Sequence, residues 1–343
     1  MCRLAVVILN WNGAEMMKEY LPSVVRCSVS DQVDVYVADN GSTDNSLELL
    51  RNDFPDVKII ELDKNYGFAE GYNKAFVHID AEYYLLLNSD VEIRQKGWLE
   101  PMISYMDLHP EVAACQPKLL SLRYEGQFEY AGASGGFIDR YGYPYCRGRV
   151  FDVVEADKGQ YDDIVQLFWA TGAALMVRSS DYWNAGGLDG RFFAHMEEID
   201  FCWRLRSLGR EIVCIPQSEA YHLGGATLSK ENPRKTFLNF RNNLLMLYKN
   251  LPQSELRYIM TTRMILDGVA ALQFALKGEF GNFKAVWKAH NEFRRLRPDF
   301  VESRKKNMDR CVLSDIPERR RFFLLWSFFV RMRRTYNQLP FSN

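Results

Sequence analysis

Apolar and polar positions alternate in blocks along the first quarter of the chain. The apolar runs that have the length of buried strands are residues 4–9, 33–38, 57–62 and 83–87. The stretches between them that carry helical spacing or helix-starting residues are residues 14–26, 45–52 and 65–73. Strands that alternate with helices in this way predict a doubly wound α/β fold with a parallel sheet.

Polar residues directly follow one of these apolar runs. Residues 84–87 lead into Asn88, Ser89 and Asp90. Open α/β sheets bind their ligands at the carboxyl ends of the strands, where a carboxylate suits a divalent cation held against a phosphate. A buried strand followed by an ordinary polar turn is the alternative that the residues leave open.

The pattern loosens after Asp90 and becomes helical near residue 235. We expect a helix over residues 97–108, loops and short strands over 120–165, and strands over 167–177 and 212–215. Three helices are then expected at residues 235–250, 254–277 and 281–297. No uninterrupted apolar run reaches the roughly 18–20 residues of a transmembrane helix, so none is expected.

Charge divides the chain into two parts. Residues 251–343 carry 18 Lys and Arg against 9 Asp and Glu, so residues 1–250 carry 25 against 35. A large domain over 1–250 with a basic helical region over 251–343 is the natural division. Within that region, residues 319–334 hold nine apolar residues between arginines. They fit either a helix lying at a membrane surface or a terminal helix docked on its own domain.

Composition narrows the compartment. The seven cysteines are scattered singly with no C-x-x-C, which indicates neither a disulfide framework nor a zinc site. Free thiols fit a reducing cytoplasm, and no secretory signal pattern opens the chain. We therefore expect a cytoplasmic protein, peripheral at the inner face of the cytoplasmic membrane.

Six stretches carry a likeness to a known family. They are residues 6–13, 37–44, 65–73, 87–90, 170–173, and 192–204 together with 222–225. In this order they resemble the family 2 inverting glycosyltransferases of the GT-A fold, especially the rhamnosyltransferase-like branch. The likeness covers roughly residues 3–250. It implies a Rossmann-like mixed sheet flanked by helices, with a helical appendage at the C-terminus.

The resemblance implies a nucleotide-sugar site made by several of these loops. In similar enzymes, the carboxylate at the position of Asp39 accepts a hydrogen bond from the base, although a turn residue or helix cap is the plain alternative. The residues expected to bind the nucleotide-sugar are Asn10, Asn12, Asp39, Gly41, Ser42, Asn65, Gly67, Asn73, Asn88 and Ser89.

A metal site is also implied by the resemblance. Asp90 is similar to the metal-binding member of the family's D-x-D element, whereas Asn88 departs from it at the first position. With one carboxylate, further ligands to Mn²⁺ or Mg²⁺ are needed, and His222 and the donor phosphates are the candidates. A lone loop histidine is otherwise usually a surface residue.

Inversion at a sugar carbon needs one base opposite the leaving diphosphate. The resemblance assigns this role to Glu198, with Glu197 and Asp200 as alternatives. The alternative is that these carboxylates only cap a helix and pair with Arg204 and Arg206.

The acceptor side is the least defined. Trp169, Thr171 and Gly172 resemble an acceptor-binding strand, where an indole stacks on a sugar, but a buried core tryptophan is equally consistent. The element Arg241-Asn242-Asn243 also resembles the family and receives no role.

The sequence therefore predicts a metal-dependent hexosyltransferase of cell-surface polysaccharide synthesis. It would move a sugar, with rhamnose the candidate from the branch, from a nucleoside diphosphate to a glycan or polyprenyl-linked acceptor. A non-catalytic scaffold that binds nucleotide-sugar is the alternative. A nucleotidylyltransferase is disfavoured because the loop at residues 10–13 has no Lys or Arg to activate a triphosphate. Nucleic acid is not an expected partner, and the oligomeric state is not predicted.

Overall fold

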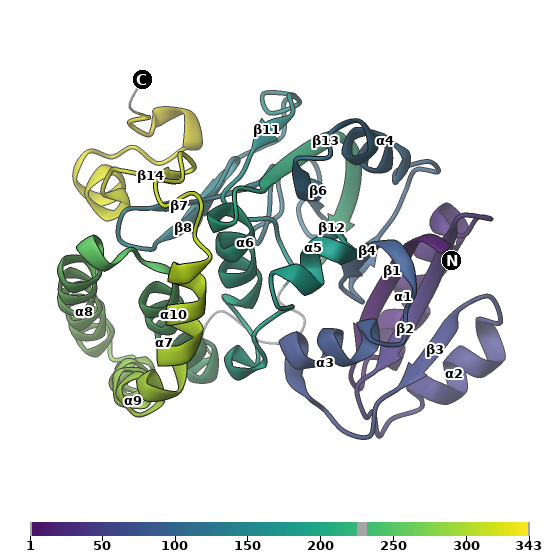
Figure 1. Cartoon of the computed structure of the whole chain (residues 1–343), viewed down its shortest axis with the longest axis horizontal. Helices are drawn as coiled ribbons and strands as arrows, with labels where there is room; N and C mark the ends of the chain where they lie inside the picture. The colour runs from purple at the N-terminus through teal and green to yellow at the C-terminus, as the bar shows by residue number, and fades with distance from the viewer. Residues whose placement is uncertain (1, 225–231, 342–343) are drawn as a thin grey trace.

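A nine-stranded mixed sheet forms the centre of this computed structural model, which describes residues 2–224 and 232–341 (Figure 1). The strand order is β11-β13-β6-β12-β4-β1-β2-β3, with β5 paired to β13. The strands are β1 (Cys2–Asn10), β2 (Val33–Asp39), β3 (Lys58–Glu61), β4 (Ala81–Leu87), β5 (Val91–Glu92), β6 (Val112–Ser121), β11 (Val165–Gln166), β12 (Ala174–Arg178) and β13 (Glu211–His222).

Strand register brings the predicted polar loops to one edge of the sheet. β1 runs parallel to both β2 and β4, with Asn10 opposite Asp39 and Ile8 opposite Leu87. β12 lies antiparallel to β4. The prediction of a mixed sheet flanked by helices is confirmed, and the carboxyl ends of β1, β2 and β4 meet where such folds bind ligands.

The sheet is buried on both faces because successive side chains of a strand point to opposite sides. In β1, Leu4, Val6 and Ile8 join one core cluster, whereas Ala5 and Val7 join the other. This double burial explains why the strands appear in the sequence as continuous apolar runs.

The helices follow the predicted order closely. The principal helices are α1 (Ala14–Ser28), α2 (Ser46–Asp53), α3 (Gly67–Phe76), α4 (Glu100–Leu108), α5 (Ser179–Asn184), α6 (Glu197–Ser207), α7 (Pro233–Asn250), α8 (Gln253–Leu276), α9 (Phe280–Leu296) and α10 (Val301–Asp309). The strand expected over 167–177 is wrong in its first half, since β12 begins at Ala174, and the strand expected at 212–215 is longer, as β13. The proposed domain boundary at residue 250 falls between α7 and α8.

A second, five-stranded sheet is seen in the described residues and includes part of the C-terminal region. Its strands are β7 (Gly136–Asp139), β8 (Pro144–Cys146), β9 (Arg149–Val150), β10 (Val153–Val154) and β14 (Arg319–Arg320). The single helix expected over 319–334 is wrong. β14 pairs with β7, and only Trp326–Val330 form a short π-helix. The backbone N–H of Leu324 donates to Asp139 Oδ2 at 2.9 Å, so this segment docks on its own domain.

Helix α8 bears on the expectation that the chain has no transmembrane helix. Among the described residues it is the one helix long and apolar enough to cross a membrane by length and composition. This is weak evidence for a span, because core helices of soluble proteins pass the same test. However, only 28% of its apolar window is buried, so α8 is not a core helix either.

Candidate active site

The ends of β1 and β2 are joined by side-chain hydrogen bonds. Asn10, nearly fully buried, donates through Nδ2 to Asp39 Oδ1 at 3.1 Å and to Ser42 Oγ at 3.2 Å. Asp39 Oδ2 accepts from the backbone N–H of Ser42 at 2.9 Å. The backbone N–H of Asn12 donates to Ser42 Oγ at 2.9 Å. Hydrogen bonds therefore join four of the residues predicted to bind the nucleotide-sugar, namely Asn10, Asn12, Asp39 and Ser42.

The loop before α3 is fastened to the same unit. Asn65 Oδ1 accepts from the backbone N–H of Gly67 at 2.8 Å and from Asn40 Nδ2 at 3.2 Å. Gly41 and Gly67 both adopt positive φ, +72° and +78°, which favours glycine. A Cβ at Gly41 would lie 2.4 Å from the backbone of Lys64, so the two loops approach closely only because this side chain is absent.

Asn73 has no free group with which to bind a ligand. Its Oδ1 accepts from the Tyr182 hydroxyl at 2.7 Å and from the Leu188 backbone N–H at 3.0 Å. Its Nδ2 donates to the Leu188 carbonyl oxygen at 2.7 Å and to Glu70 at 3.2 Å. All four positions of the amide are thus used to hold α3 against the segment after α5.

Asp90 and His222 meet at the end of the sheet. His222 Nε2 lies 3.0 Å from Asp90 Oδ1 and 3.3 Å from Asn88 Nδ2. Although burial acts to raise it, the hydrogen bond and charge of His222 lower the pKa of Asp90. Burial opposes the charged imidazole, but Glu129 and Asp90 raise the pKa of His222 to about 10.

Glu129 is a part of this group that the sequence did not reveal. Its Oε1 lies 3.4 Å from His222 Nδ1, on the side of the imidazole opposite Asp90. That distance is within ion-pair range, although the geometry is not that of a hydrogen bond, and Nδ1 has no hydrogen-bond partner among the described residues. Glu129 and His222 are both almost fully buried. The imidazole is therefore held between two carboxylates.

The stretch at residues 170–173, which also carries the family likeness, contacts both Asn88 and Glu198. The backbone N–H of Asn88 donates to the Ala173 carbonyl oxygen at 3.0 Å. A Cβ built on the neighbouring Gly172 would lie 3.1 Å from the Phe68 ring and 3.8 Å from Glu198 Cβ. Residues 172–173 thus contact Asn88 on one side and Glu198 on the other.

Glu197 and Glu198 open α6, and neither forms an ion pair within residues 2–224 and 232–341. Burial raises the pKa of Glu198 to about 7, despite backbone N–H groups that lower it. Burial, followed by the charge of Glu198, raises the pKa of Glu197 well above its usual value. One carboxylate oxygen on each residue is buried without a hydrogen bond. A carboxyl group with a pKa close to neutrality suits general-base chemistry.

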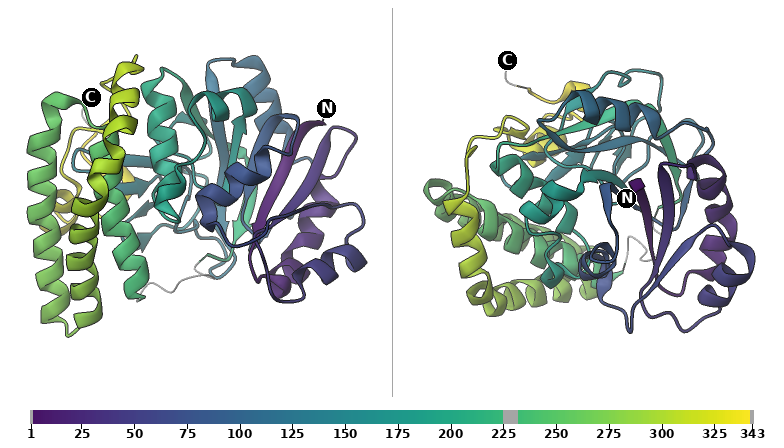
Figure 2. Two further views of the ribbon diagram at one scale, coloured as in Figure 1. Left: turned by 60° about the horizontal axis from the view of Figure 1, so that its bottom comes forward. Right: turned by 45° about the vertical axis from the view of Figure 1, so that its right-hand side comes forward.

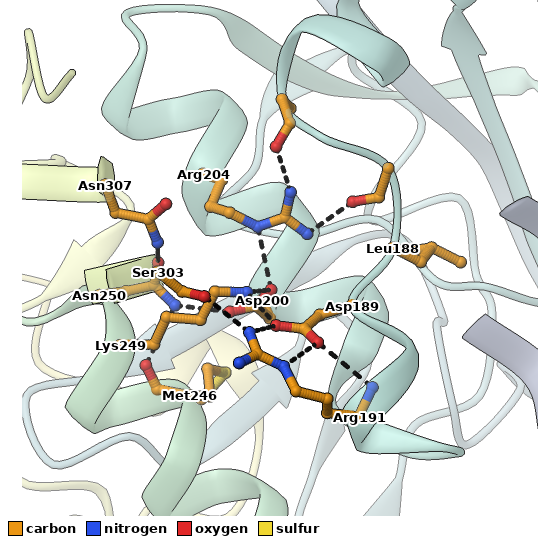
Figure 3. A network of polar contacts seen from close by, with 12 residues as sticks. Leu188, Asp189, Arg191, Asp200, Arg204, Met246, Lys249, Asn250, Ser303 and Asn307 are labelled. Atoms are coloured by element: carbon orange, nitrogen blue, oxygen red, sulfur yellow. Dashed lines mark hydrogen bonds and ion pairs between the residues drawn. The ribbon is translucent and has the colours of Figure 1, made fainter. Parts of the chain in front are cut away.

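Asp200, unlike the two glutamates, is held by cationic and amide partners (Figure 3). It is fully buried and accepts from Arg204 Nε at 3.0 Å, Lys249 Nζ at 2.8 Å and Asn250 Nδ2 at 2.7 Å. Lys249 also binds Asp189 at 2.7 Å. Asp200 therefore ties α6 to α7. It pairs with Arg204, as the alternative of a purely structural carboxylate predicts.

Comparison with known proteins agrees with this geometry. Residues 5–134 match the sequence model described as Glycosyl transferase family 2. The N-acetylglucosaminyl-diphospho-decaprenol L-rhamnosyltransferase of Mycobacterium tuberculosis is 22% identical over 64% of this chain and 75% of that protein. The O-antigen biosynthesis protein RfbC of Myxococcus xanthus is 23% identical over 64% of this chain, but this chain spans only 17% of that protein.

A solved structure shows the same fold. The mannosyltransferase of Pyrobaculum calidifontis, in complex with GDP-Man and Mn²⁺, has a TM-score of 0.51 and 15% identity over 89% of this chain and 87% of that chain. Residues 5–134 thus form a domain of the glycosyl transferase family 2 type. The fold of the chain is GT-A, and the chain is an enzyme of sugar transfer.

The glycosyltransferase has residues that fit a divalent cation. The described residues hold no group of three or more His, Cys, Asp or Glu able to bind a metal ion. The protein would therefore supply Asp90 and His222, and the donor phosphates the remaining oxygens. Glu129 matches the carboxylates that orient metal-binding imidazoles through the other ring nitrogen.

Trp169 lies in the core of the glycosyltransferase. It is 3% exposed, and its indole N–H donates to the Phe137 carbonyl oxygen at 2.9 Å. A Cβ on Gly136 would lie 2.1 Å from the indole, so this glycine makes the space for the ring. Thr171 is likewise buried, and its backbone N–H donates to Gln116 at 3.0 Å. The third acceptor-side residue, Gly172, lies beside the candidate base.

The Arg241-Asn242-Asn243 element holds the loop that leads into α6. Phe193, His195 and Met196 all have positive φ, between +66° and +72°, which is costly for residues other than glycine. The Asn242 side-chain amide donates to the carbonyl oxygens of Phe192, Ala194 and His195 at 3.0, 2.8 and 2.7 Å. The sequence showed this element but not its contacts, which join α7 to a loop almost fifty residues earlier.

Proposed function

We propose that this glycosyltransferase moves a hexose from a nucleoside diphosphate to a glycan or polyprenyl-linked acceptor, with inversion, in cell-surface polysaccharide synthesis. The observation that carries the proposal is Glu198. It is a carboxyl group of pKa about 7 that forms no ion pair within the described residues and lies beside Gly172, just before β12.

Each part of the site has a task in this reaction. Asp39, fixed by Asn10 and Ser42, would accept a hydrogen bond from the donor's base. Glu198 would take the proton of the acceptor hydroxyl as that oxygen attacks the sugar carbon. Asp90 and His222 would hold Mn²⁺ or Mg²⁺, which neutralises charge that develops on the leaving diphosphate.

The identity of the sugar is a narrower proposal. The relative from Mycobacterium tuberculosis is named as a rhamnosyltransferase, and its name also gives a decaprenol-linked sugar as the acceptor. The similar mannosyltransferase structure holds GDP-Man. Rhamnose on a thymidine diphosphate, transferred to a polyprenyl-linked glycan at the cytoplasmic membrane face, is therefore the first donor and acceptor pair to test.

A donor panel tests the proposal directly. The purified chain is incubated with Mn²⁺ and with thymidine, uridine or guanosine diphosphate sugars, and release of the nucleoside diphosphate is measured. We expect one donor to be hydrolysed slowly without acceptor and Asp90→Ala to abolish that release while the fold is kept. If a donor binds tightly but is never turned over, with or without acceptors, the protein is a nucleotide-sugar-binding scaffold and the proposal is wrong.

A further inference from the structure

The outer face of α8 carries a stripe of exposed apolar side chains. Ile265, Val269, Leu272 and Leu276 are 64%, 61%, 57% and 81% exposed. Their spacing of four, three and four residues places them along one side of a helix. A stripe of this length on a soluble surface usually marks an interaction site.

Helix α9 carries a second set of exposed apolar side chains. α8 and α9 lie side by side as an antiparallel pair at the edge of the molecule farthest from β3 (Figure 2). Phe280, Phe283 and Trp287 are exposed, and they are spaced three and four residues apart on α9. We call these seven residues of α8 and α9 the apolar face.

The inner side of α8 fixes it to the protein. Arg263 and Asp267 are buried and joined at 2.7 Å, and Asp267 also binds His290 of α9 at 3.1 Å. A helix that left this position to cross a bilayer would carry an ion pair into hydrocarbon, which is costly. α8 is therefore placed to lie along a surface rather than to span a membrane.

Charge indicates which surface that is. Exposed Lys277, Lys284 and Lys288 stand beside the apolar face, and Glu279 is the one acidic residue between positions 268 and 291. Lysines next to Trp and Phe suit the boundary between lipid headgroups and acyl chains. A second copy docked about a two-fold axis would bring like charges together. Anionic lipid is the complementary partner.

The position of the apolar face suits the active site. The turn between α8 and α9 lies toward the same end of the molecule as the carboxyl ends of β1 and β2 (Figure 2). At this end, a Cβ on Gly281 would lie 3.0 Å from Pro233, where α7 begins. We infer that the apolar face docks the enzyme on an anionic membrane surface. The bearing on a lipid-linked acceptor rests on the proposed function, but the docking does not.

Vesicle binding without donor or acceptor tests the inference. The full chain is sedimented with phosphatidylcholine vesicles that contain or lack phosphatidylglycerol. We expect binding to the anionic vesicles, and a loss of about tenfold or more for the combined variant Val269→Ser, Leu272→Ser and Trp287→Ser, because buried apolar area sets interfacial affinity. Leu108→Ser, at an exposed apolar residue in α4, is the matched control and should bind as the parent does.

A second variant tests the charge argument. Lys277→Gln, Lys284→Gln and Lys288→Gln together should weaken binding to anionic vesicles and reduce its salt dependence, with little change on neutral ones. Thermal unfolding and donor hydrolysis in lipid-free solution separate a folding defect from lost docking. The inference is wrong if the parent ignores anionic vesicles. It is equally wrong if the serine variant binds them normally, or if it only converts a solution dimer into a monomer.

Discussion

The side-chain amide of Asn242 donates to the carbonyl oxygen of His195 at 2.7 Å, two residues before the glutamate pair that opens α6. The same amide also reaches two further carbonyl oxygens of this loop, and Asn242 is fully buried. Three residues of the loop have unfavourable positive φ. The amide thus offsets a strained conformation in the loop that leads into Glu197 and Glu198.

Asn242→Asp should therefore act on turnover rather than on donor binding. A carboxylate has the same shape but donates no hydrogen bond to carbonyl oxygens, so the loop is expected to relax. We expect kcat to fall by about tenfold or more with the donor KM nearly unchanged, since misplacing a reacting group costs rate steeply. The pH dependence that Glu198 gives to the rate should change or disappear in the same variant.

Asn282→Ala supplies the matched control. Asn282 is also buried, and its side-chain amide donates to Glu279 at 2.7 Å and accepts from the Thr236 hydroxyl at 2.9 Å, where α9 meets α7. It should lower stability to a similar degree while leaving kcat close to that of the parent. An equal fall of kcat in both variants would show that Asn242 only supports the fold.

The activity should depend on the ionisation of Glu198. Burial raises its pKa to about 7, and only the carboxylate accepts a proton. Hence kcat/KM is expected to rise as pH increases through about 7 and then level off. Glu198→Gln should remove nearly all activity and Glu197→Gln much less. If kcat/KM does not change between about pH 5 and about pH 9, Glu198 is not the base.

Stability should show the opposite response to the same group. The folded-state pKa of Glu198, about 7, lies above its ordinary value of 4.5, so the native state binds more protons than the unfolded state between these values. Its unfavourable contribution therefore grows as pH rises from about 4.5 to about 7. Glu198→Gln is expected to stabilise the enzyme by about 1–3 kcal/mol at pH values above this window, and by little below it. Denaturant unfolding at two pH values measures the difference.

Lys249 should be important for stability without contact with the reacting groups. Lys249→Met removes the ammonium group that joins Asp189 to the fully buried Asp200. Arg191 and Arg204 still neutralise these carboxylates, so we expect a loss of about 2–3 kcal/mol rather than more. Lys305→Met, at an exposed position in α10, should change stability by less than about 0.5 kcal/mol. Equal unfolding free energies for the two variants would contradict this account.

The sequence predicted those parts of the site that follow strands. Asp39 and Asp90 stand at strand ends, where the parallel sheet itself brings them together, and the glutamates of α6 were found through a family likeness. Glu129 could not be found in this way, since it comes from the irregular segment after β6 and meets His222 only in the folded chain. The burial of Trp169 depends on the missing side chain of Gly136, which no local pattern reveals. The tail misled for a related reason, because β7 offers residues 319–320 a strand partner that competes with a helix.

Glu129 gives the sharpest test of the metal site. Its carboxylate lies on the Nδ1 side of His222, whereas Asp90 lies on the Nε2 side. If Asp90 and Nε2 bind the cation, Glu129 orients the ring and does not bind metal itself. Glu129→Gln should then weaken Mn²⁺ affinity about 10–100-fold, as loss of such an orienting carboxylate does elsewhere. Asp90→Asn should weaken it at least as much. Titration calorimetry with Mn²⁺ and nucleoside diphosphate reports this affinity independently of turnover, and unchanged binding in both variants would place the metal elsewhere.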